Sequence, residues 1–597
     1  MFLPAFTLQL DFSKSIGKPK FYQGVFKTGN PGPSISQQGF DDIIEICSHG
    51  NRHSIILGSP IVDNKVDRKK SAKLLLEAEN IEHFAQNLNG EFLAVRWNES
   101  ARKIEVITDR FSSYPIFWAQ RKNKLCLSYN YMDIAKHVSA WPGFKLRPEK
   151  AYEFFILQRL IGEDTHDTIT QSLPPATIMA VKKDEKPQLQ RYWHPDYNKD
   201  YVSSEKQLVN EFDVLFKNAV RVRLGNDKQK TGIFLSGGHD SRLVAAYANI
   251  KTTCYTLSFS DNLEVDVARD ISNICGHDHV YSALNENFFE DMLHITAPLS
   301  AGLYTADHAL FIASGMTPAP TADIFLHGHG LDFMFQGMYL HAKYYQLFGR
   351  NTTIKHFLPV PADLPNHFIH SIPFRLKFDL APYIAHRDFD ESVRIAIDNV
   401  YTYAKTLSDE PLDHLEYMIF HNPSRHYTFS NVLSKRMCGE VRTPSFDNDL
   451  YRFYQSLPFK YRLHANMMRG AMYKINPRIA NLKAANHALP AGWGPYSKTA
   501  LLLARKIARH ATFNQFFRGP WSNDRTWPDR DDYFREHESY RVASFAPLED
   551  PGFKDFLSFI DWDKLKRDQK ILEQQKLYGA FLVTLLSYYR FYKELER

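Results

Sequence analysis

The sequence predicts an α/β protein with a mostly β domain over residues 1–195, a doubly wound parallel-sheet domain over residues 204–500 and a helical extension over residues 501–597. Three observations predict this organisation. The length of 597 residues exceeds what one hydrophobic core usually supports, so more than one domain is expected. Near residue 204, the apolar pattern changes from short strand-like runs to alternating strands and helices. Beyond residue 500, the pattern is helical and rich in arginine, lysine and aromatic residues.

The first domain is marked by short runs of β-branched and aromatic residues, as at 91–97, 103–108 and 125–129. Charged residues or Gly, Asn and Pro separate these runs, which is the usual composition of turns between strands. The segment 1–12 is apolar but lacks the basic start and small-residue cleavage site of a signal peptide. Its partial alternation favours a strand, so we expect a mainly β domain without a leader peptide.

The second domain begins with a helix after the polar stretch 195–203. Ser204 and Gln207 have the spacing of a capping box, and apolar residues recur at helical spacing from 209 to 222. The next predicted elements are strands over 232–235, 253–259, 280–283 and 323–326 and helices over 240–249 and 264–275. Such alternation predicts a parallel sheet with helices on both faces.

The composition excludes several classes of protein. Hydrophobic residues make up 44% and charged residues 23%, which is typical of a soluble globular chain. The net charge of +6 has no clustered basic tract, so no nucleic-acid partner is expected. Five scattered cysteines favour a reducing compartment, and we expect a cytoplasmic location. The late apolar run 577–586 is too short to span a bilayer, so no membrane association is expected.

A glycine turn directly follows the strand predicted over 232–235 and opens the next helix; it reads Leu235-Ser236-Gly237-Gly238-His239-Asp240-Ser241-Arg242. Its glycines let backbone N–H groups converge on an anion at the helix N-terminus. Ser236 and Ser241 are placed to donate hydroxyls to phosphate, and Asp240 is placed to hold Mg²⁺, which prefers oxygen ligands. The turn is neither a Walker A loop nor a dinucleotide turn. The order of strand, glycine pair, acid and hydroxyl favours a phosphate site over a plain glycine turn.

Further motifs follow this turn in a fixed order along the chain: Thr256-Leu257-Ser258-Phe259, Leu326-His327-Gly328-His329-Gly330-Leu331-Asp332 and the segment 440–447. Together with the turn, whose pattern is S-G-G-x-D-S, they resemble the asparagine synthetase family, including its relatives the β-lactam synthetases and lasso-peptide cyclases. The resemblance implies a PP-loop ATP pyrophosphatase domain that adenylates a carboxylate and passes it to an amine. It implies that ATP and Mg²⁺ are used, with Mg²⁺ held by Asp240 and Asp332. The residues that it implies for the nucleotide are Leu235, Ser236, Gly237, Gly238, Asp240, Ser241, Leu257, Ser258, Phe259, Gly328 and Gly330.

Two positions depart from the family pattern. His329 stands where the family has an acid, and an imidazole suits a general base, although a packed or capping histidine is as good an interpretation. Asn486 lies nearest the position of the family's late catalytic lysine. Lys483 or Lys474 is the candidate substitute, and an ordinary surface lysine is the better interpretation of either.

The first domain resembles the glutamine-hydrolysing domain of the same family in segments 89–95, 109–111 and 127–128. The resemblance implies an Ntn-like αββα sandwich whose nucleophile is a cysteine directly after the initiator methionine. Phe2 stands there instead, and no Cys, Ser or Thr precedes Thr7, so we expect no glutamine hydrolysis. Asn89 and Gly90 look like the oxyanion-hole pair of the family, but we assign them a structural role.

These observations predict a ligase that needs a small-molecule, peptide or sugar carboxylate and either ammonia or an amine; the sequence does not choose between the donors, and it leaves a homo-oligomer open. Two alternatives remain, namely a glutamine-dependent asparagine synthase and a catalytically silent nucleotide-binding regulatory protein. Other signals are weak. The cluster 275–279 has zinc-ligand types at a predicted helix end, and the basic stretch 506–518 is better explained as a solvated amphipathic face.

Overall fold

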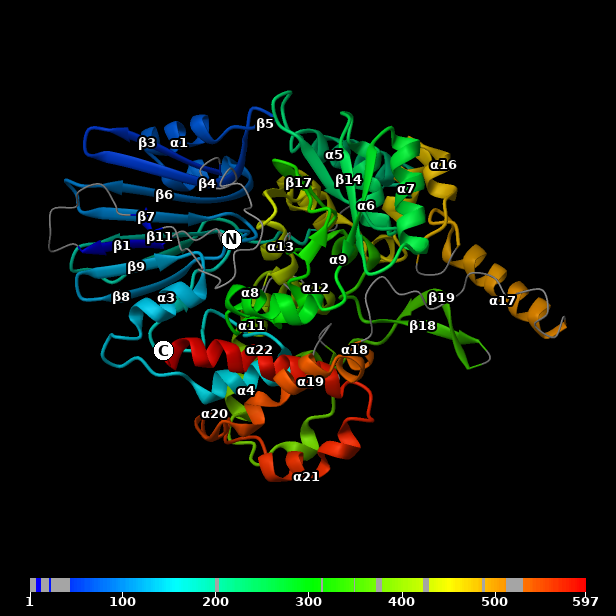
Figure 1. Cartoon of the computed structure of the whole chain (residues 1–597). Coiled ribbons are helices and arrows are strands. Elements are labelled where there is room, and N and C mark those ends of the chain that lie inside the picture. Colours follow the sequence, from blue (N-terminus) through cyan, green and yellow to red (C-terminus); the bar gives the residue numbers. More distant parts are fainter. Residues whose placement is uncertain are drawn as a thin grey trace.

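A computed structural model describes most of the chain. It covers residues 7–11, 21–22, 43–198, 203–312, 315–347, 349–371, 378–421, 429–485, 489–511 and 530–596. Strands and helices are mixed throughout, and the molecule is an α/β protein whose two sheet-containing parts lie side by side (Figure 1). Among the helices that these ranges include, none combines the length and the apolar character that a bilayer-spanning segment needs.

The N-terminal part contains two antiparallel sheets. One has the order β10-β8-β9-β1-β2, and the other has the order β12-β11-β7-β6-β4-β3, with β5 paired to β4. The strands of the first sheet are β1 (Thr7–Asp11), β2 (Phe21–Tyr22), β8 (Phe117–Arg121), β9 (Lys124–Ser128) and β10 (Gln171–Ser172). Those of the second are β3 (Ile44–His49), β4 (Arg52–Val62), β5 (Lys65–Val66), β6 (Asn89–Asn98), β7 (Lys103–Thr108), β11 (Thr177–Lys182) and β12 (Gln188–Arg191).

Alternation along these strands produces four layers. Leu93 and Val95 of β6 face the space between the sheets together with Leu127 of β9. Phe92 and Ala94 point the other way, into a core shared with α1 (Arg68–Glu77) and α2 (Ile81–Asn87). On the outer face of the first sheet lies α3 (Tyr131–Val138), whereas α4 (Pro148–Leu157) lies farther from this sheet, among the C-terminal helices (Figure 1). Because successive side chains point to opposite faces of a strand, each sheet buries both of its faces.

The second part is built on one six-stranded sheet with the order β16-β15-β14-β13-β17-β20. Its strands are β13 (Thr231–Phe234), β14 (Thr253–Ser258), β15 (Asp278–Leu284), β16 (Met316–Thr317), β17 (Ile324–Leu326) and β20 (Glu440–Arg442). All neighbours are parallel except the edge strand β16. The strands predicted from sequence are confirmed to within two residues at each end, whereas β16 and β20 were not predicted as strands.

Helices cover both faces of this sheet, as the alternating pattern predicts. On one face lie α5 (Glu205–Arg221), α6 (His239–Tyr247) and α7 (Leu263–Cys275), which share a core with Ile233 and Leu326. On the other face lie α8 (Phe288–Ser300) and α13 (Phe429–Lys435), which pack against Phe234 and Phe325. The capping box predicted at the start of α5 is present: Ser204 and Gln207 bond each other's backbone N–H groups.

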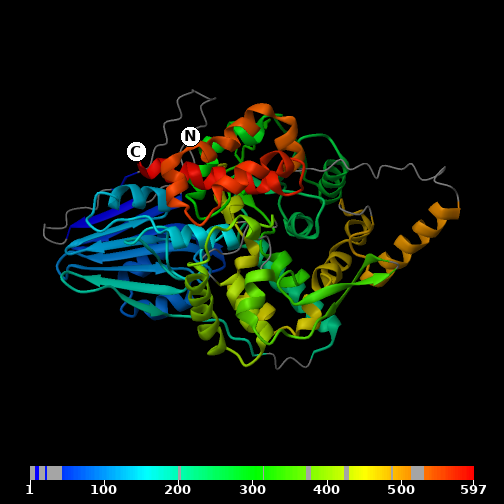
Figure 2. The same cartoon turned by 90° about the horizontal axis from the view of Figure 1, so that it is seen from below.

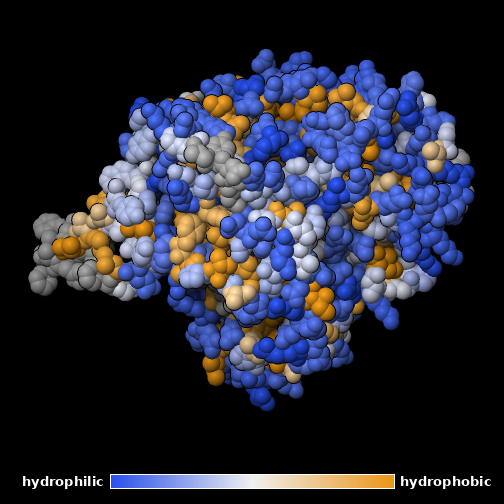
Figure 3. Space-filling view, turned by 180° about the vertical axis from the view of Figure 1, so that it is seen from behind, coloured by the Kyte–Doolittle hydropathy of each residue, from blue (hydrophilic) through white to orange (hydrophobic). Residues whose placement is uncertain are grey.

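Further helices surround the sheet: α9 (Leu331–Gln336), α10 (Leu364–Ser371), α11 (Asp390–Lys405), α12 (Pro411–Phe420), α14 (Asn448–Ser456), α15 (Asn466–Ile475) and α16 (Pro477–Asn481). The hairpin of β18 (Ala342–Leu347) and β19 (Arg350–Phe357) extends from the body beside α17 (Pro495–Ala511), as Figures 1 and 2 show. Figure 3 shows apolar residues on this projecting part, where Ile507 of α17 is 69% exposed.

The remaining helices are α18 (Arg530–Glu536), α19 (Glu538–Phe545), α20 (Pro551–Phe556), α21 (Trp562–Leu572) and α22 (Tyr578–Glu596). They do not form a separate layer. Tyr588 of α22 packs on Phe154 and Phe155 of α4, and Lys136 of α3 pairs with Glu594 at 2.6 Å. The C-terminal helices therefore share a core with the N-terminal part (Figure 2).

Candidate active site

The strand order places the candidate site. From β13 the chain proceeds through α6 to β14 and then to β15 on one side, whereas β17 and β20 lie on the other side of β13. The loops after β13 and β17 therefore diverge at a topological switch point, where ligands bind in open α/β sheets. The predicted glycine turn follows β13, and the predicted loop from His327 to Gly330 follows β17.

The glycine turn is shaped by its two serines. The N–H of Ser236 donates to Oγ of Ser241 at 3.0 Å, and the Oγ of Ser241 donates to the carbonyl of Ser236 at 3.2 Å. Gly238 is the N-cap residue of α6, and no side chain caps this end. The first N–H groups of α6 thus meet the turn, which suits a phosphate group. Gly237 is required by packing, because a Cβ there would lie 2.6 Å from Cβ of Ala485.

Arg242 holds the turn against the segment before α17. Its guanidinium is fully buried and donates to the carbonyls of Gly237 at 3.0 Å and Lys483 at 2.7 Å. It also donates to the carbonyls of Ile479 at 2.9 Å and Leu482 at 3.1 Å. Arginine presents several donors in a rigid fork, so one side chain fixes both walls of the turn.

Two carboxylates meet beside the turn. Asp240 lies in the first turn of α6 and Asp332 in the first turn of α9, and both are half-buried. Burial raises the pKa of Asp240 well above its usual range, and the nearby carboxylate of Asp332 raises that pKa further. Burial also raises the pKa of Asp332 to about 6. Two carboxylates whose negative charges repel each other in this way make a site for a cation.

The approach of the two loops depends on Gly328. A Cβ at this position would lie 2.6 Å from Cβ of Asp240 and 2.7 Å from its carbonyl carbon. Gly330 has a φ of +88°, in the left-handed region that favours glycine, and it starts α9. Gln336 at the end of α9 donates to Oδ1 of Asp240 at 2.8 Å. The loop thus carries Asp332 to the site and lets it approach Asp240.

The carboxyl end of β14 adjoins this site. Leu257 and Ser258 are buried, and Phe259 is half-buried against the rings of Phe288 and Phe289. Asn262 donates to Oγ of Ser258 at 3.0 Å. Because β14 is the parallel neighbour of β13, this segment lies at the same edge of the sheet as the glycine turn.

The remaining predicted residues lie in different settings. The backbone N–H of His329 donates to Nδ1 of His327 at 3.2 Å, and its ring lies edge-on to Phe446. Lys483 is exposed, and its carbonyl accepts from Arg242. Lys474 forms a 2.6 Å ion pair with Asp213 of α5 and exposes 42% of its side chain. Asn486 lies outside the described residues.

The sequence pattern did not indicate Lys498. This residue lies in the first turn of α17 and is 7% exposed, and its ammonium donates to the carbonyl of Ala491 at 3.1 Å. The same carbonyl lies 3.0 Å from Nε2 of His239 in the glycine turn. Burial and the charges of Arg469 and Arg242 lower the pKa of Lys498 to about 8. No local signal distinguishes this lysine from the other basic residues of an amphipathic helix.

The sequence pattern also did not indicate Lys435. This lysine is 7% exposed at the end of α13, with its ammonium 4.0 Å from the ring centre of Phe311 and 5.8 Å from that of Phe234. Burial lowers the pKa of Lys435 to about 7. The charge of Lys435 helps to lower the pKa of His327, so this cation belongs to the surroundings of the β17 loop.

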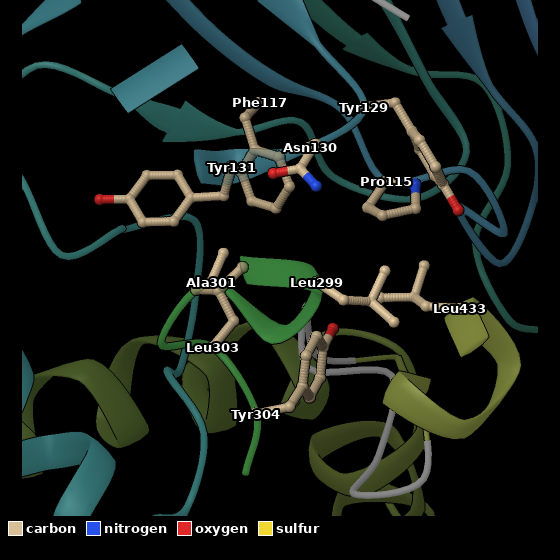
Figure 4. A pocket seen from close by; sticks show the side chains of 10 residues that line it. All are labelled: Pro115, Phe117, Tyr129, Asn130, Tyr131, Leu299, Ala301, Leu303, Tyr304 and Leu433. Carbon is tan, nitrogen blue, oxygen red and sulfur yellow. The ribbon is translucent and has the colours of Figure 1, made fainter. Parts of the chain in front are cut away.

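Two further features bear on ligands. Within the described ranges, no three His, Cys, Asp or Glu side chains are grouped to hold a metal ion, so Cys275 and its neighbours form no zinc cluster there. A space of about 20 Å³ lies between Tyr129 and Tyr131 of the N-terminal part and Leu299 and Leu433 of the sheet domain (Figure 4). That volume admits about one water molecule, so this space is too small for a substrate.

Comparison with known proteins finds similarity in the sheet domain. Residues 211–485 match the model of the asparagine synthase family. The curated protein Amidase chry2 of Gibberella zeae is 24% identical over 219 residues, which cover 33% of this chain and 31% of that protein. The chain thus spans about a third of the length of this curated relative.

Two solved structures show only slight likeness. Glutamine phosphoribosylpyrophosphate amidotransferase from B. subtilis, complexed with ADP and GMP, is 9% identical with a TM-score of 0.21, covering 48% of this chain and 61% of that one. A structure described as the allosteric regulatory enzyme of purine biosynthesis is 8% identical with a TM-score of 0.22, covering 47% and 74%. This similarity is too low to assign a fold to either part of the molecule.

Proposed function

We propose that this chain, whose residues 211–485 match the asparagine synthase family model, is an ATP-dependent carbon–nitrogen ligase that joins a carboxylate to ammonia or an amine without hydrolysing glutamine. The observation that carries the proposal is the pair of carboxylates of Asp240 and Asp332 beside the glycine turn, at the switch point of a parallel sheet. Their two negative charges repel each other and suit a cation, and the uncapped start of α6 suits a polyphosphate.

The proposed reaction has two steps. A carboxylate oxygen of the substrate attacks the α-phosphorus of ATP, the bond to the bridging oxygen breaks, and pyrophosphate leaves. The nitrogen of the amine then attacks the acyl carbon, the bond to AMP breaks, and the amine loses a proton. Small-molecule, peptide and sugar carboxylates all remain candidate substrates.

Each group of residues at the site has its own role in this reaction. Ser236, Ser241 and the backbone of Gly237 and Gly238 would hold the departing phosphates, and Leu257, Ser258 and Phe259 would line the adenine site. Asp240 and Asp332 would hold Mg²⁺, which when bound neutralises phosphate charge and completes its coordination with phosphate and water oxygens.

The proton of the amine needs an acceptor. His329, in the loop after β17, is our candidate because an imidazole titrates near neutrality. Lys483 is the alternative because it lies in the segment that Arg242 holds against the turn. Lys474 is a weaker candidate because its ammonium already pairs with Asp213.

Asn89 supports the absence of glutamine hydrolysis. Its Nδ2 donates to Asp447 at 2.9 Å, and its Oδ1 accepts the N–H of Asn448 at 3.0 Å. Both groups of this amide therefore have partners in the ligase domain, as expected of a structural residue. The first cysteine of the printed sequence is Cys47, in the edge strand β3. We further propose that the four layers around Asn89 are an Ntn-type αββα sandwich and that the ligase domain is of the PP-loop type.

The test is exchange of labelled pyrophosphate into ATP over a panel of carboxylates. Exchange that depends on one carboxylate is expected, and Asp240→Asn should lower it at least ~10²-fold through loss of charge stabilisation. Unchanged exchange in that variant would refute the metal assignment. Tight ATP binding without AMP or pyrophosphate formation would favour a regulatory protein, and release of glutamate from glutamine would contradict glutamine independence.

A further inference from the structure

A continuous chain of hydrogen bonds leads from the N-terminal part into the loop after β17. Glu91 of β6 is 1% exposed, and its two carboxylate oxygens accept from Thr443, at 2.5 Å from the backbone N–H and at 2.9 Å from the hydroxyl. Oγ1 of Thr443 lies 3.3 Å from Nε2 of His327. Nδ1 of His327 lies 3.2 Å from the backbone nitrogen of His329.

The direction of each bond in this chain is determined. A backbone N–H only donates, so Nδ1 of His327 must accept from His329 and the ring proton must be on Nε2. That Nε2–H donates to Oγ1 of Thr443, whose own proton is then directed to Glu91. Burial and the charges of Lys435 and Arg436 hold the pKa of His327 well below its usual range, which keeps the ring neutral as this pattern requires.

The chain ends on the loop that forms the site. The ring of His327 bonds back to the backbone two residues later and so spans Gly328. Gly328 is the residue whose Cα packs against Asp240, and the loop continues through Gly330 into the helix that carries Asp332. The position of the His327 ring therefore governs the approach of the two carboxylates.

Other buried groups hold the same two surfaces together. Arg436 of the ligase domain donates to the carbonyl of Ser113 at 2.6 Å and to the hydroxyl of Tyr129 at 2.9 Å. Glu440 accepts from Ser59 at 2.5 Å and pairs with Arg68 at 2.5 Å. Buried charges cost stability unless each is well paired, so this contact is a specific joint between the two parts.

We propose that Glu91 is a positioning residue of the ligase site: through Thr443 and His327 it holds the 327–330 loop so that Asp240 and Asp332 bind one Mg²⁺–nucleotide. The N-terminal part thereby contributes to the ligase reaction without any chemistry of its own. The inference rests on the proposed function in one respect, which is that the site binds Mg²⁺–ATP.

The test is calorimetric titration of the full chain with ATP, in Mg²⁺ and in EDTA. Glu91→Gln removes the charge that accepts from Thr443 and lies 3.8 Å from Nη2 of Arg436, and affinity for Mg²⁺–ATP should fall about 10-fold, as for other residues that orient metal ligands. Affinity in EDTA should not change. The matched control is Glu105→Gln on the adjacent strand β7, whose buried carboxylate pairs with Arg96 and Lys103 and should leave both affinities unchanged.

Two further variants separate positioning from loss of structure. Thr443→Val removes the hydroxyl but keeps the backbone bond to Glu91, and it should reproduce the effect of Glu91→Gln, whereas Thr443→Ser should recover affinity. In an Asp332→Asn background, Glu91→Gln should have no further effect on Mg²⁺–ATP binding, because both changes act on the same carboxylate pair.

Three results would overturn the inference alone: affinity of Glu91→Gln within twofold of the unmodified chain, equal losses in Glu91→Gln and Glu105→Gln, or additive losses with Asp332→Asn. If Glu91→Gln does not fold, the Thr443 pair decides: equal affinities in the Val and Ser variants would overturn it. An unmodified chain that binds no Mg²⁺–ATP would overturn the proposed function together with this inference.

Discussion

The carboxylate pair predicts a conflict between stability and function, which Asp240→Asn tests. In the metal-free protein, the pKa of Asp332 is raised from 3.8 to about 6 and that of Asp240 is raised further by burial and by Asp332. A folded-state pKa above the unfolded value means that the folded protein binds more protons, so stability falls as pH rises through this range. A rise of the pKa from 3.8 to about 6 corresponds to about 3 kcal/mol. This value is the upper limit of the stability that Asp332 costs the folded protein at pH 8.

Asparagine at 240 removes one charge but keeps an oxygen that can accept from Gln336. We expect the metal-free variant to be more stable than the unmodified chain at pH 8 by about 2–3 kcal/mol, and the difference should shrink to about 0.5 kcal/mol near pH 4, where the unfolded carboxylate is about half protonated. Urea unfolding in EDTA, followed by tryptophan fluorescence between pH 4 and pH 8, measures this difference. Mg²⁺ with ATP should stabilise the unmodified chain and not the variant.

The matched control is Asp270→Asn, because Asp270 is an exposed carboxylate on α7. It should change stability by less than about 0.5 kcal/mol at every pH. A variant at 240 that is less stable than the unmodified chain at pH 8 would refute the reasoning. A stability difference that does not change with pH would also refute the reasoning, because the two carboxylates would then not repel each other.

Three other substitutions test the site. Gly328→Ala places a methyl group against Asp240 and should weaken Mg²⁺–ATP binding at least ~10-fold by calorimetry; Gly552→Ala, where a Cβ meets only ordinary contacts, should not, and equal affinities would contradict the packing argument. Arg242→Gln leaves loop carbonyls without donors and should cost at least ~3 kcal/mol in urea unfolding; a smaller loss would show that the clamp is dispensable. Lys498→Met should be more stable than the unmodified chain at pH 7, and the difference should shrink from pH 8 to pH 10, because a lowered lysine pKa makes the unmodified chain gain stability as pH rises. A constant difference would show that Lys498 is not responsible.

Local pattern accounts for what could be predicted. The strands β13, β14, β15 and β17 and the helices α6 and α7 were predicted because short apolar runs and helix-like segments alternate along consecutive residues. The glycine turn was predicted for the same reason, since its glycines and hydroxyls are neighbours in sequence. The pairing of Asp240 with Asp332 was implied by the family resemblance, and it fits parallel strands, whose carboxyl ends meet at one edge.

Contacts between distant segments could not be predicted in this way. Lys498 follows the pattern of an exposed basic helix, yet the chain buries it on the carbonyl that also contacts His239. Arg242 was recognised only as the end of a motif, because three of the four carbonyls that it binds lie on the distant segment 479–483. Nothing near Lys435 indicates that two phenylalanine rings from other elements enclose it.

The sequence by itself determined the α/β character, the strands and helices around the turn, and the residue types that suit phosphate and Mg²⁺, because these depend on short-range spacing. Only the tertiary structure decided how the N-terminal part meets the site. Glu91 and Thr443 are 352 positions apart, and their bond forms because two separately folded sheets bury polar groups against each other. A buried carboxylate needs hydrogen-bond donors, and its donors can come from any segment that the fold places beside it. The local sequence around the carboxylate therefore does not indicate which segment supplies them.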